Sequence, residues 1–162
     1  MGLQIYITGG TFDKVYNPIS EKLEFTETHI PEILRSGRNA YNVSLETLML
    51  KDSLYMTDED RQFILEKCQN CLEGRILIAH GTGTMIETAG VLGQNLRDKT
   101  VVLIGAMVPY SIFDSDAVFN FAFGYGIVQV LPNGTYIAMN GRIFDWDNVR
   151  KNPKTGEFET IK

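Results

Sequence analysis

The chain has 162 residues, of which 44% are hydrophobic and 22% charged, so it is long enough to form one domain around a single core. Its 15 basic and 20 acidic residues give a net charge of −5, which argues against nucleic acid as a partner because phosphate binding needs a basic surface. No apolar run approaches the roughly 18 residues of a membrane span, and the N-terminus lacks the basic segment and cleavage site of a secretion signal. We therefore expect one cytoplasmic domain over residues 1–162, with neither nucleic acid nor membrane as a partner.

The first predicted elements are two strands separated by irregular chain. Apolar and polar residues alternate over Leu3–Thr8, which predicts a strand leading into a turn with two glycines, Thr8–Thr11. Phe12–Thr28 shows no clear periodicity and is expected to be a loop or a hairpin. The next expected elements are a short helix over Pro31–Ser36 and a strand over Ala40–Leu50 with a break near Glu46–Thr47.

Two cysteines, Cys68 and Cys71, lie near the end of a helix that Thr57 is expected to cap together with Asp60. A redox pair would be better placed at a helix N-terminus, where the helix dipole lowers the pKa of a thiol. Zinc would need two further ligands, and none lies nearby in the sequence. We interpret both residues as structural cysteines in a reducing compartment.

The most informative stretch is Arg75–Ala89, with the sequence RILIAHGTGTMIETA. Ile76–Ala79 is typical of a short buried strand, and His80–Thr84 follows as a tight turn of small residues. A helix is expected to begin at Met85, and N–H groups at a helix start beside hydroxyls suit an anion or a developing oxyanion. The structural alternative is a tight turn with threonine caps.

Strands and helices alternate to the end of the chain. The remaining expected elements are strands over Thr100–Ile104, Tyr136–Met139, Arg142–Phe144 and Phe158–Ile161, and a helix over Ala117–Val130. This order predicts an α/β three-layer sandwich with a mostly parallel central sheet. Because ligands bind at the carboxyl ends of strands in such sheets, four segments are expected to converge: Thr8–Thr11, Asp52–Ser53, His80–Thr84 and Gly105–Met107.

The converging segments supply backbone N–H groups and hydroxyls, which come from Thr11, Ser53, Thr82 and Thr84. The sequence contains no Ser-His-Asp order, no cluster of metal ligands and no complete P-loop, so we expect neither a metal nor a cofactor. A hydroxyl nucleophile needs a base, and a lysine kept neutral by burial can serve.

Several of these motifs occur together, and in the same order, in one known family. They are Thr8-Gly9-Gly10-Thr11, the HGTxTMxETA pattern of His80–Ala89, Val101–Met107, Phe119-Asn120 and Met139–Lys151. In them the chain resembles the bacterial-type L-asparaginase/glutaminase family. The resemblance runs over most of the chain and covers only the N-terminal domain of that family, so it implies an asparaginase N-terminal-domain-like fold.

The resemblance implies amide hydrolysis through a threonine acyl-enzyme. Thr11 falls on the nucleophile of the family, Thr82 on its second catalytic threonine, and Lys151 on the lysine that works with it. Ser53 falls on the serine that holds the α-carboxylate of the substrate. The expected substrate-binding residues are Gly10, Asp52, Ser53, Gly81, Gly83 and Ala106.

The chain departs from the family at three places. Gly83 stands where the family has an aspartate that binds the α-ammonium of the substrate, and Leu54 replaces a common glutamine. The flap tyrosine has no counterpart, since Tyr16 lies only five residues after Thr11.

We expect an amidohydrolase for a small amide, with doubtful activity on free asparagine. The alternative is a catalytically weak or inactive module that binds a small ligand.

A homo-oligomer, most simply a dimer, is expected on two grounds. The resemblance implies a site buried between subunits, and the expected helix over residues 117–130 is apolar, with an aromatic face suited to the core or to a subunit contact.

Overall fold

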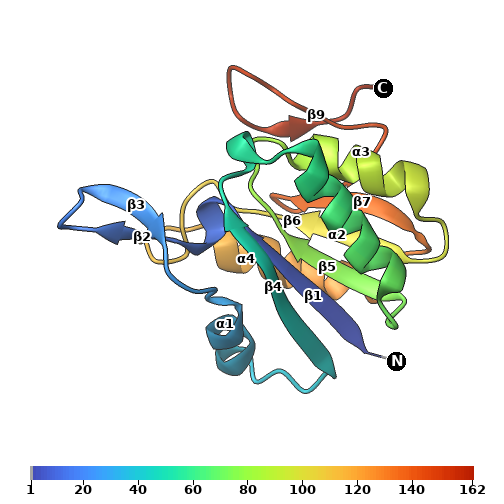
Figure 1. Ribbon diagram of the computed structural model, residues 1–162, viewed down its shortest axis with the longest axis horizontal. Coiled ribbons are helices and arrows are strands. Elements are labelled where there is room, and N and C mark those ends of the chain that lie inside the picture. Colours follow the sequence, from blue (N-terminus) through green and yellow to red (C-terminus); the bar gives the residue numbers. More distant parts are fainter. Residues whose placement is uncertain (1) are drawn as a thin grey trace.

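A six-stranded sheet forms the centre of the computed structural model, which describes residues 2–162 (Figure 1). From one edge to the other its strands are β4 (Val43–Lys51), β1 (Leu3–Gly9), β5 (Arg75–Ala79), β6 (Thr100–Ile104), β7 (Gly134–Met139) and β8 (Arg142–Asp145). The first five are parallel, and β8 pairs antiparallel with β7. The expected mostly parallel sheet is therefore confirmed.

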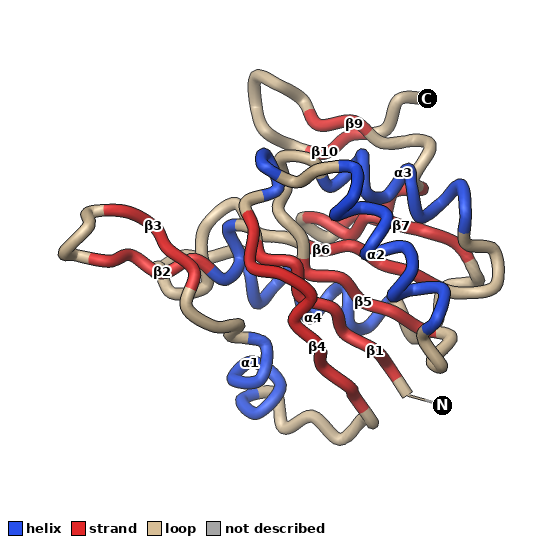
Figure 2. The backbone as a smooth tube through the Cα atoms, in the orientation of Figure 1, coloured by secondary structure: helices blue, strands red, loops and turns tan. Residues whose placement is uncertain are grey.

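Two pairs of helices cover the two faces of the sheet and complete the three layers (Figure 2). On one face lie α2 (Asp58–Asn70) and α3 (Met85–Asn95), and on the other α1 (Ile30–Ser36) and α4 (Ala117–Ile127). The strand β5 serves both layers, because its alternate apolar residues enter separate core clusters. Among residues 2–162, no helix is long and apolar enough to cross a membrane.

The crossovers on either side of β6 have opposite hands. From β5 to β6 and from β6 to β7 the chain steps across the sheet in the same direction, yet α3 and α4 lie on opposite faces. The crossovers through α1, α2 and α3 share the usual right hand, so the one through α4 is left-handed, which parallel sheets almost never show. As a result the loop after β5 leaves toward one face, and the loops after β1 and β6 on either side of it leave toward the other.

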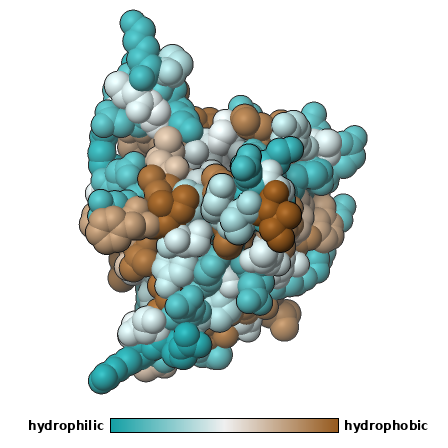
Figure 3. Space-filling view, turned by 90° about the vertical axis from the view of Figure 1, so that its left-hand side faces the viewer, coloured by the Kyte–Doolittle hydropathy of each residue, from teal (hydrophilic) through white to brown (hydrophobic). Residues whose placement is uncertain are grey.

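A hairpin follows β1, so the second of the two expectations for residues 12–28 is confirmed. It consists of β2 (Lys14–Asn17) and β3 (Lys22–Phe25) and projects from the body of the molecule (Figure 1). Tyr16 on β2 is 54% exposed. Figure 3 looks onto the side from which the hairpin projects, and hydrophobic patches alternate there with hydrophilic residues.

Several features differ from the expected ones, beyond shifts of one to three residues at other element ends. The register shift in β4 lies after Thr47, between the pairs Ile7–Thr47 and Gly9–Lys51. The helix α2 ends at Asn70 because Cys71 is already extended, although its Thr57 and Asp60 capping box is present as expected. The helix α4 stops at Ile127 ahead of Pro132, which cannot continue a helix. The expected last strand is shortened to β10 (Phe158–Glu159), and it pairs with an unexpected partner, β9 (Arg150–Lys151).

The tail that carries β9 and β10 lies beside α3 (Figure 1). A tryptophan of the tail makes the contact with that helix. Gly93 on α3 lies against the Trp146 ring so closely that a Cβ there would come within 2.3 Å of ring carbons. Val149 and Phe158, which flank β9 along the chain, are buried in the core beneath α2 and α3. The position of β9 therefore depends on non-local packing against α3.

We expect Gly93→Ala to displace the tail. The added methyl group overlaps the Trp146 ring, so the substitution should lower the free energy of unfolding by about 1–3 kcal/mol despite the better helix propensity of alanine. The chain has one tryptophan, so the fluorescence maximum of Trp146 should also shift to the red as the ring becomes exposed.

Gly90→Ala is the matched control, because it makes the same change one turn earlier on α3, where a Cβ would meet no atom within 4 Å. It should raise the free energy of unfolding by about 0.5–1 kcal/mol and leave the fluorescence maximum in place. Equal effects of the two substitutions in urea unfolding would show that Trp146 does not anchor the tail.

Candidate active site

The turns that follow β1 and β5 pack directly against each other. Gly9 and Gly10 have φ angles of 99° and 81°, in the left-handed region that favours glycine. A Cβ at Gly10 would lie 2.4 Å from the Cα of Gly81, so a side chain does not fit between the two turns. This contact places Thr11, the next residue, at the turn that contains Thr82. Between residues 2 and 162 no group forms a hydrogen bond with the Thr11 hydroxyl.

Thr82 and Lys151 are 69 residues apart in the sequence and meet in the structure. Lys151 Nζ lies 3.0 Å from Thr82 Oγ1 and 3.5 Å from the Thr82 carbonyl oxygen. The half-buried ammonium sits 5.8 Å from the centre of the Phe158 ring, and burial lowers the pKa of Lys151 below its ordinary value. A lysine whose charged form is disfavoured in this way is suited to accept a proton.

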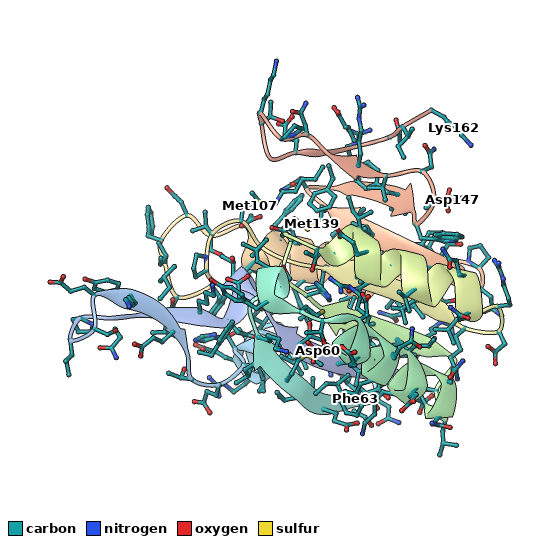
Figure 4. All side chains as sticks on the ribbon, turned by 45° about the horizontal axis from the view of Figure 1, so that its top comes forward. Asp60, Phe63, Met107, Met139, Asp147 and Lys162 are labelled. Atoms are coloured by element: carbon teal, nitrogen blue, oxygen red, sulfur yellow. The ribbon has the colours of Figure 1, made fainter. Side chains whose placement is uncertain are left out.

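Met107 reaches the same threonine from the segment after β6. The Thr82 hydroxyl is 3.6 Å from its Sδ, and the side chain is 44% exposed. Figure 4 shows Met107 at the end of the sheet where Met139 ends the neighbouring strand β7. The preceding residue, Ala106, is buried in the core toward α1 and α4, so its side chain faces away from this turn.

The buried His80 side chain stabilises the turn through two hydrogen bonds. It is fully buried, with Nδ1 2.8 Å from the Gly81 carbonyl oxygen and Nε2 2.8 Å from the Thr88 hydroxyl. A carbonyl can only accept, so Nδ1 carries the proton and Nε2 accepts from Thr88. Burial lowers the pKa of His80 to about 4, and the ring is therefore neutral at pH 7.

Ser53 is brought to the turn by a one-turn 3₁₀ helix, Ser53–Tyr55. The side chain is buried, and its Oγ accepts the Thr84 N–H at 3.3 Å. The Thr84 hydroxyl in turn donates to the Ser53 carbonyl at 2.7 Å. Ser53 thus keeps its own hydroxyl hydrogen for another acceptor, and a Cβ at Gly81 would lie 2.5 Å from its Oγ.

Asp52 precedes Ser53, and its negative charge is balanced by an ion pair with Lys14. Its carboxylate accepts from Lys14 Nζ at 2.6 Å and from the Leu54 N–H at 3.0 Å. The hydrogen bond from Lys14 is the main reason that the pKa of Asp52 lies below its ordinary value. Lys14 comes from the base of the β2–β3 hairpin, so this ion pair also ties the hairpin to the site.

Gly83 is the exposed member of the turn and lies against a leucine. A Cβ at this position would be 2.8 Å from Leu54 Cδ2 and 3.0 Å from Ser53 Oγ. The structure thus brings the predicted residues Gly10, Thr11, Ser53, Gly81, Thr82, Gly83 and Lys151 together around one turn. Of the predicted set, Asp52 is engaged with Lys14, and Ala106 offers only its backbone to this region.

A sequence model described as "Asparaginase, N-terminal" matches residues 2–162. The chain belongs to the asparaginase family. Among related proteins, L-asparaginase 2 of Escherichia coli (strain K12) is 35% identical over 93 residues, which are 53% of this chain and 26% of that protein. A component of the glutamyl-tRNA(Gln) amidotransferase of Methanococcus vannielii is 33% identical over 121 residues, which are 72% of this chain and 27% of that protein.

The solved structure of the thermostable L-asparaginase from Thermococcus kodakarensis has the same fold as this asparaginase-family chain. The TM-score is 0.82 at 26% identity, and the match covers 99% of this chain and 51% of that one. The chain therefore spans about half the length of that structure, and the matched segments cover 26% and 27% of the two related proteins above.

Lys14 belongs to this asparaginase-family site and was missed by reasoning from the sequence. Leu54, Thr84 and Met107 were named in that reasoning, without the contacts that they make in the structure. Each of the four lies within two or three residues of a residue that was predicted, so proximity along the converging segments was the available signal. Which of them faces the site depends on the turn geometry, which the sequence pattern does not specify.

The two cysteines lie outside this site and are free thiols. Burial raises the pKa of Cys68 to about 12, which leaves it a poor nucleophile and favours a structural interpretation. Within residues 2–162, no three His, Cys, Asp or Glu side chains are grouped so that they could hold a metal ion.

The buried His80 predicts a loss of stability in acid. Its pKa is about 4 in the folded chain against 6.5 in its ordinary state, so between these values the unfolded chain binds a proton that the folded chain does not. The free energy of unfolding should therefore fall as the pH is lowered from about 6.5 to about 4, by about 3 kcal/mol from this group. Urea unfolding at several pH values measures it.

His80→Gln should flatten this fall, whereas His29→Gln, the same change at the other histidine, should retain it. Burial raises the pKa of Asp13, so that carboxyl acts in the opposite direction. It is unchanged in His80→Gln, whereas in His29→Gln it loses the nearby imidazole and keeps the hydrogen bond from the backbone N–H of residue 29. If the His80→Gln protein kept the full pH dependence, another group would be its source.

Proposed function

We propose that this asparaginase-family chain hydrolyses the amide bond of a small molecule through an acyl-enzyme on Thr11. The observation that carries the proposal is the contact between Lys151 and the Thr82 hydroxyl, 3.0 Å long, in which burial lowers the pKa of the lysine. This Lys151–Thr82 contact lies beside the turn that contains Thr11. The Thr11 hydroxyl forms no hydrogen bond with any group among residues 2–162. Relatives named L-asparaginase support amide hydrolysis as the general class of reaction.

In the first step the Thr11 oxygen attacks the carbonyl carbon of the amide. Lys151, in its neutral form, takes up the hydroxyl proton by way of Thr82, because its amine is in hydrogen-bond contact with that hydroxyl. The oxygen of the tetrahedral intermediate is stabilised by N–H groups of the turn, where those of Thr82 and Gly83 have no acceptor among the described residues. The C–N bond then breaks, and the proton on Lys151 passes to the leaving nitrogen.

In the second step water attacks the acyl carbon and regenerates the threonine. The Thr82–Lys151 pair takes one proton from the water and returns it to the Thr11 oxygen as the ester bond breaks, so a carboxylic acid leaves. Ser53 has an unused hydroxyl hydrogen and is proposed to donate it to the substrate, together with backbone groups at Gly10, Gly81 and Gly83. The reaction as proposed uses no cofactor.

The proposal also includes a reducing, cytoplasmic location and self-association. The free Cys68 and Cys71 thiols support the former. For the latter, α4 exposes Val118 by 46% and Phe119 by 61%, a surface suited to a second copy of the chain.

Thr11→Val should abolish hydrolysis of every amide or ester that the protein accepts. Valine keeps the branched shape of threonine and removes the nucleophilic oxygen, so the fold should persist. A panel of small amides and esters, followed by ammonia or acid release, measures the loss against a melting curve of the same protein.

Thr135→Val is the matched control. It makes the same change at a buried threonine on β7 whose hydroxyl has no partner among the described residues, so it should keep full activity and raise the free energy of unfolding by about 1 kcal/mol. Hydrolysis that survived Thr11→Val would exclude the proposed mechanism. A protein that bound an amide without hydrolysing any would be a binding module.

Lys151→Met should lower the rate of acylation by about 10²- to 10⁴-fold, because the proton then has no acceptor. Adding Thr11→Val should cause no further loss, since the two groups act as one unit. In the parent, kcat/KM should rise with pH toward a pKa below the ordinary value of lysine, and this rise should vanish in Lys151→Met.

Single-turnover rates measure these losses, and Lys154→Met, an exposed lysine in the same tail, is the control that should leave them unchanged. Losses that added up in the double variant, or a retained pH profile, would assign Lys151 a structural role.

A further inference from the structure

The side of the site at Gly83 is formed by an apolar wall. Leu54 leaves the one-turn helix that carries Ser53 and lies against the exposed backbone of Gly83, with its Cδ2 2.8 Å from the place of a Cβ there. Its side chain is 70% exposed, and neighbouring Tyr55 is 76% exposed. A molecule seated on the turn would therefore meet hydrocarbon on this side.

The charges around the turn are unequal. Lys151 Nζ lies 3.0 Å from Thr82 Oγ1 and has no ion-pair partner among residues 2–162, so it offers a ligand either a neutral amine or a positive charge and never a negative one. The carboxylate nearest along the chain to Leu54 is Asp52, which is paired with Lys14. Glu87, in the first turn of α3, is exposed to solvent. A positive charge on a ligand at Gly83 would thus face Leu54 and the Lys151 amine, with Glu87, which points to solvent, as the one carboxylate among those named that no ion pair engages.

Two further carboxylates, Asp116 and Glu157, line a cavity that Met107 also borders. Asp116 accepts the backbone N–H groups of Met107 and Val108 at 3.0 Å. With Glu157 it lines a cavity of about 310 Å³ whose walls include neither Leu54 nor Gly83. The cavity that these acids line is therefore distinct from the Leu54 side of the turn.

We propose that the substrate is an acyl amide without a cationic group, whose hydrocarbon chain packs on Leu54. This inference rests on the proposed amide hydrolysis and adds the class of substrate. An uncharged or anionic amide needs no counter-charge, which Lys151 supplies in neither its neutral nor its protonated form. A chain of several methylenes covers the exposed leucine, which is favourable because it removes apolar surface from water. Leu54 and Gly83 are then the residues that determine specificity.

Two matched pairs of amides test the two parts of this inference. Asparagine and succinamic acid differ only by the ammonium group, and kcat/KM should be about tenfold or more higher for succinamic acid. Propionamide and hexanamide differ only in chain length, and hexanamide should be favoured by about tenfold. Equal or better turnover of asparagine would overturn the exclusion of a cation, and equal turnover of the two neutral amides would overturn the role of the hydrocarbon.

Variants assign the preference to named residues. Leu54→Gln should remove the preference for hexanamide over propionamide, whereas Leu72→Gln, at a leucine that is 100% exposed elsewhere, should retain that preference. Gly83→Asp combined with Leu54→Ala should raise the ratio of asparagine to succinamic acid about tenfold. The second substitution makes room for the carboxylate, and the φ angle at Gly83 is not in the left-handed region. Identical profiles for Leu54→Gln and Leu72→Gln would refute the proposal.

Binding to the Thr11→Val protein separates this inference from the proposed function. Calorimetric titration should show hexanamide binding that Leu54→Gln weakens about tenfold, whether or not the parent turns the amide over. If the parent hydrolysed no amide yet bound hexanamide in this Leu54-dependent way, the proposed function would fail and the ligand class would stand. If hydrolysis depended on Thr11 while binding ignored Leu54, the proposed function would stand and the ligand class would fail.

Discussion

The contact between the backbones of Gly10 and Gly81 sets the positions of the groups around the candidate site. Two turns from neighbouring parallel strands touch where a single methyl group would separate them, since a Cβ at Gly10 would lie 2.4 Å from the Gly81 Cα. Thr11 and Thr82 each follow one of these glycines directly, so neither threonine can move far without opening the contact. The buried His80 fixes the second turn further, because its only possible proton arrangement ties the Gly81 carbonyl to Thr88.

The topology explains why polar groups gather at this turn. The chain enters the loop after β5 toward one face of the sheet, and the loops on both sides of it leave toward the other face, a consequence of the left-handed crossover through α4. Neighbouring loops that diverge leave room at the strand ends for a ligand. Ser53 and Leu54 reach this place from β4, at the far side of β1, and Lys151 reaches it from the tail.

Local patterns predicted most of the fold, and non-local packing decided what they missed. The order of strands and helices, the Thr57 capping box and the four converging segments follow from periodicity and turn residues, which act over a few positions. The two-residue strand β9 has no such signal, because it is held by Phe158 and by the Trp146 contact with Gly93. The meeting of Leu54 with Gly83 and of Met107 with Thr82 depends likewise on side-chain directions in turns. For the candidate site, therefore, the motifs predicted which backbone segments meet, and the structure was needed to show which side chains face them.

The tail has a consequence for how the site is held together. β9 pairs with β10 and with no strand of the central sheet, and its hold on the molecule is the packing of a few side chains against α3 and the core beneath it. The tail can therefore detach as a local opening while all six sheet strands stay paired, at a free energy below that of global unfolding. Such an open form keeps both threonines in register and lacks only the amine. Under the proposed mechanism, such an opening would withdraw the proton acceptor and leave the sheet intact, so a contact that holds or releases the tail would act on the reaction from outside the site.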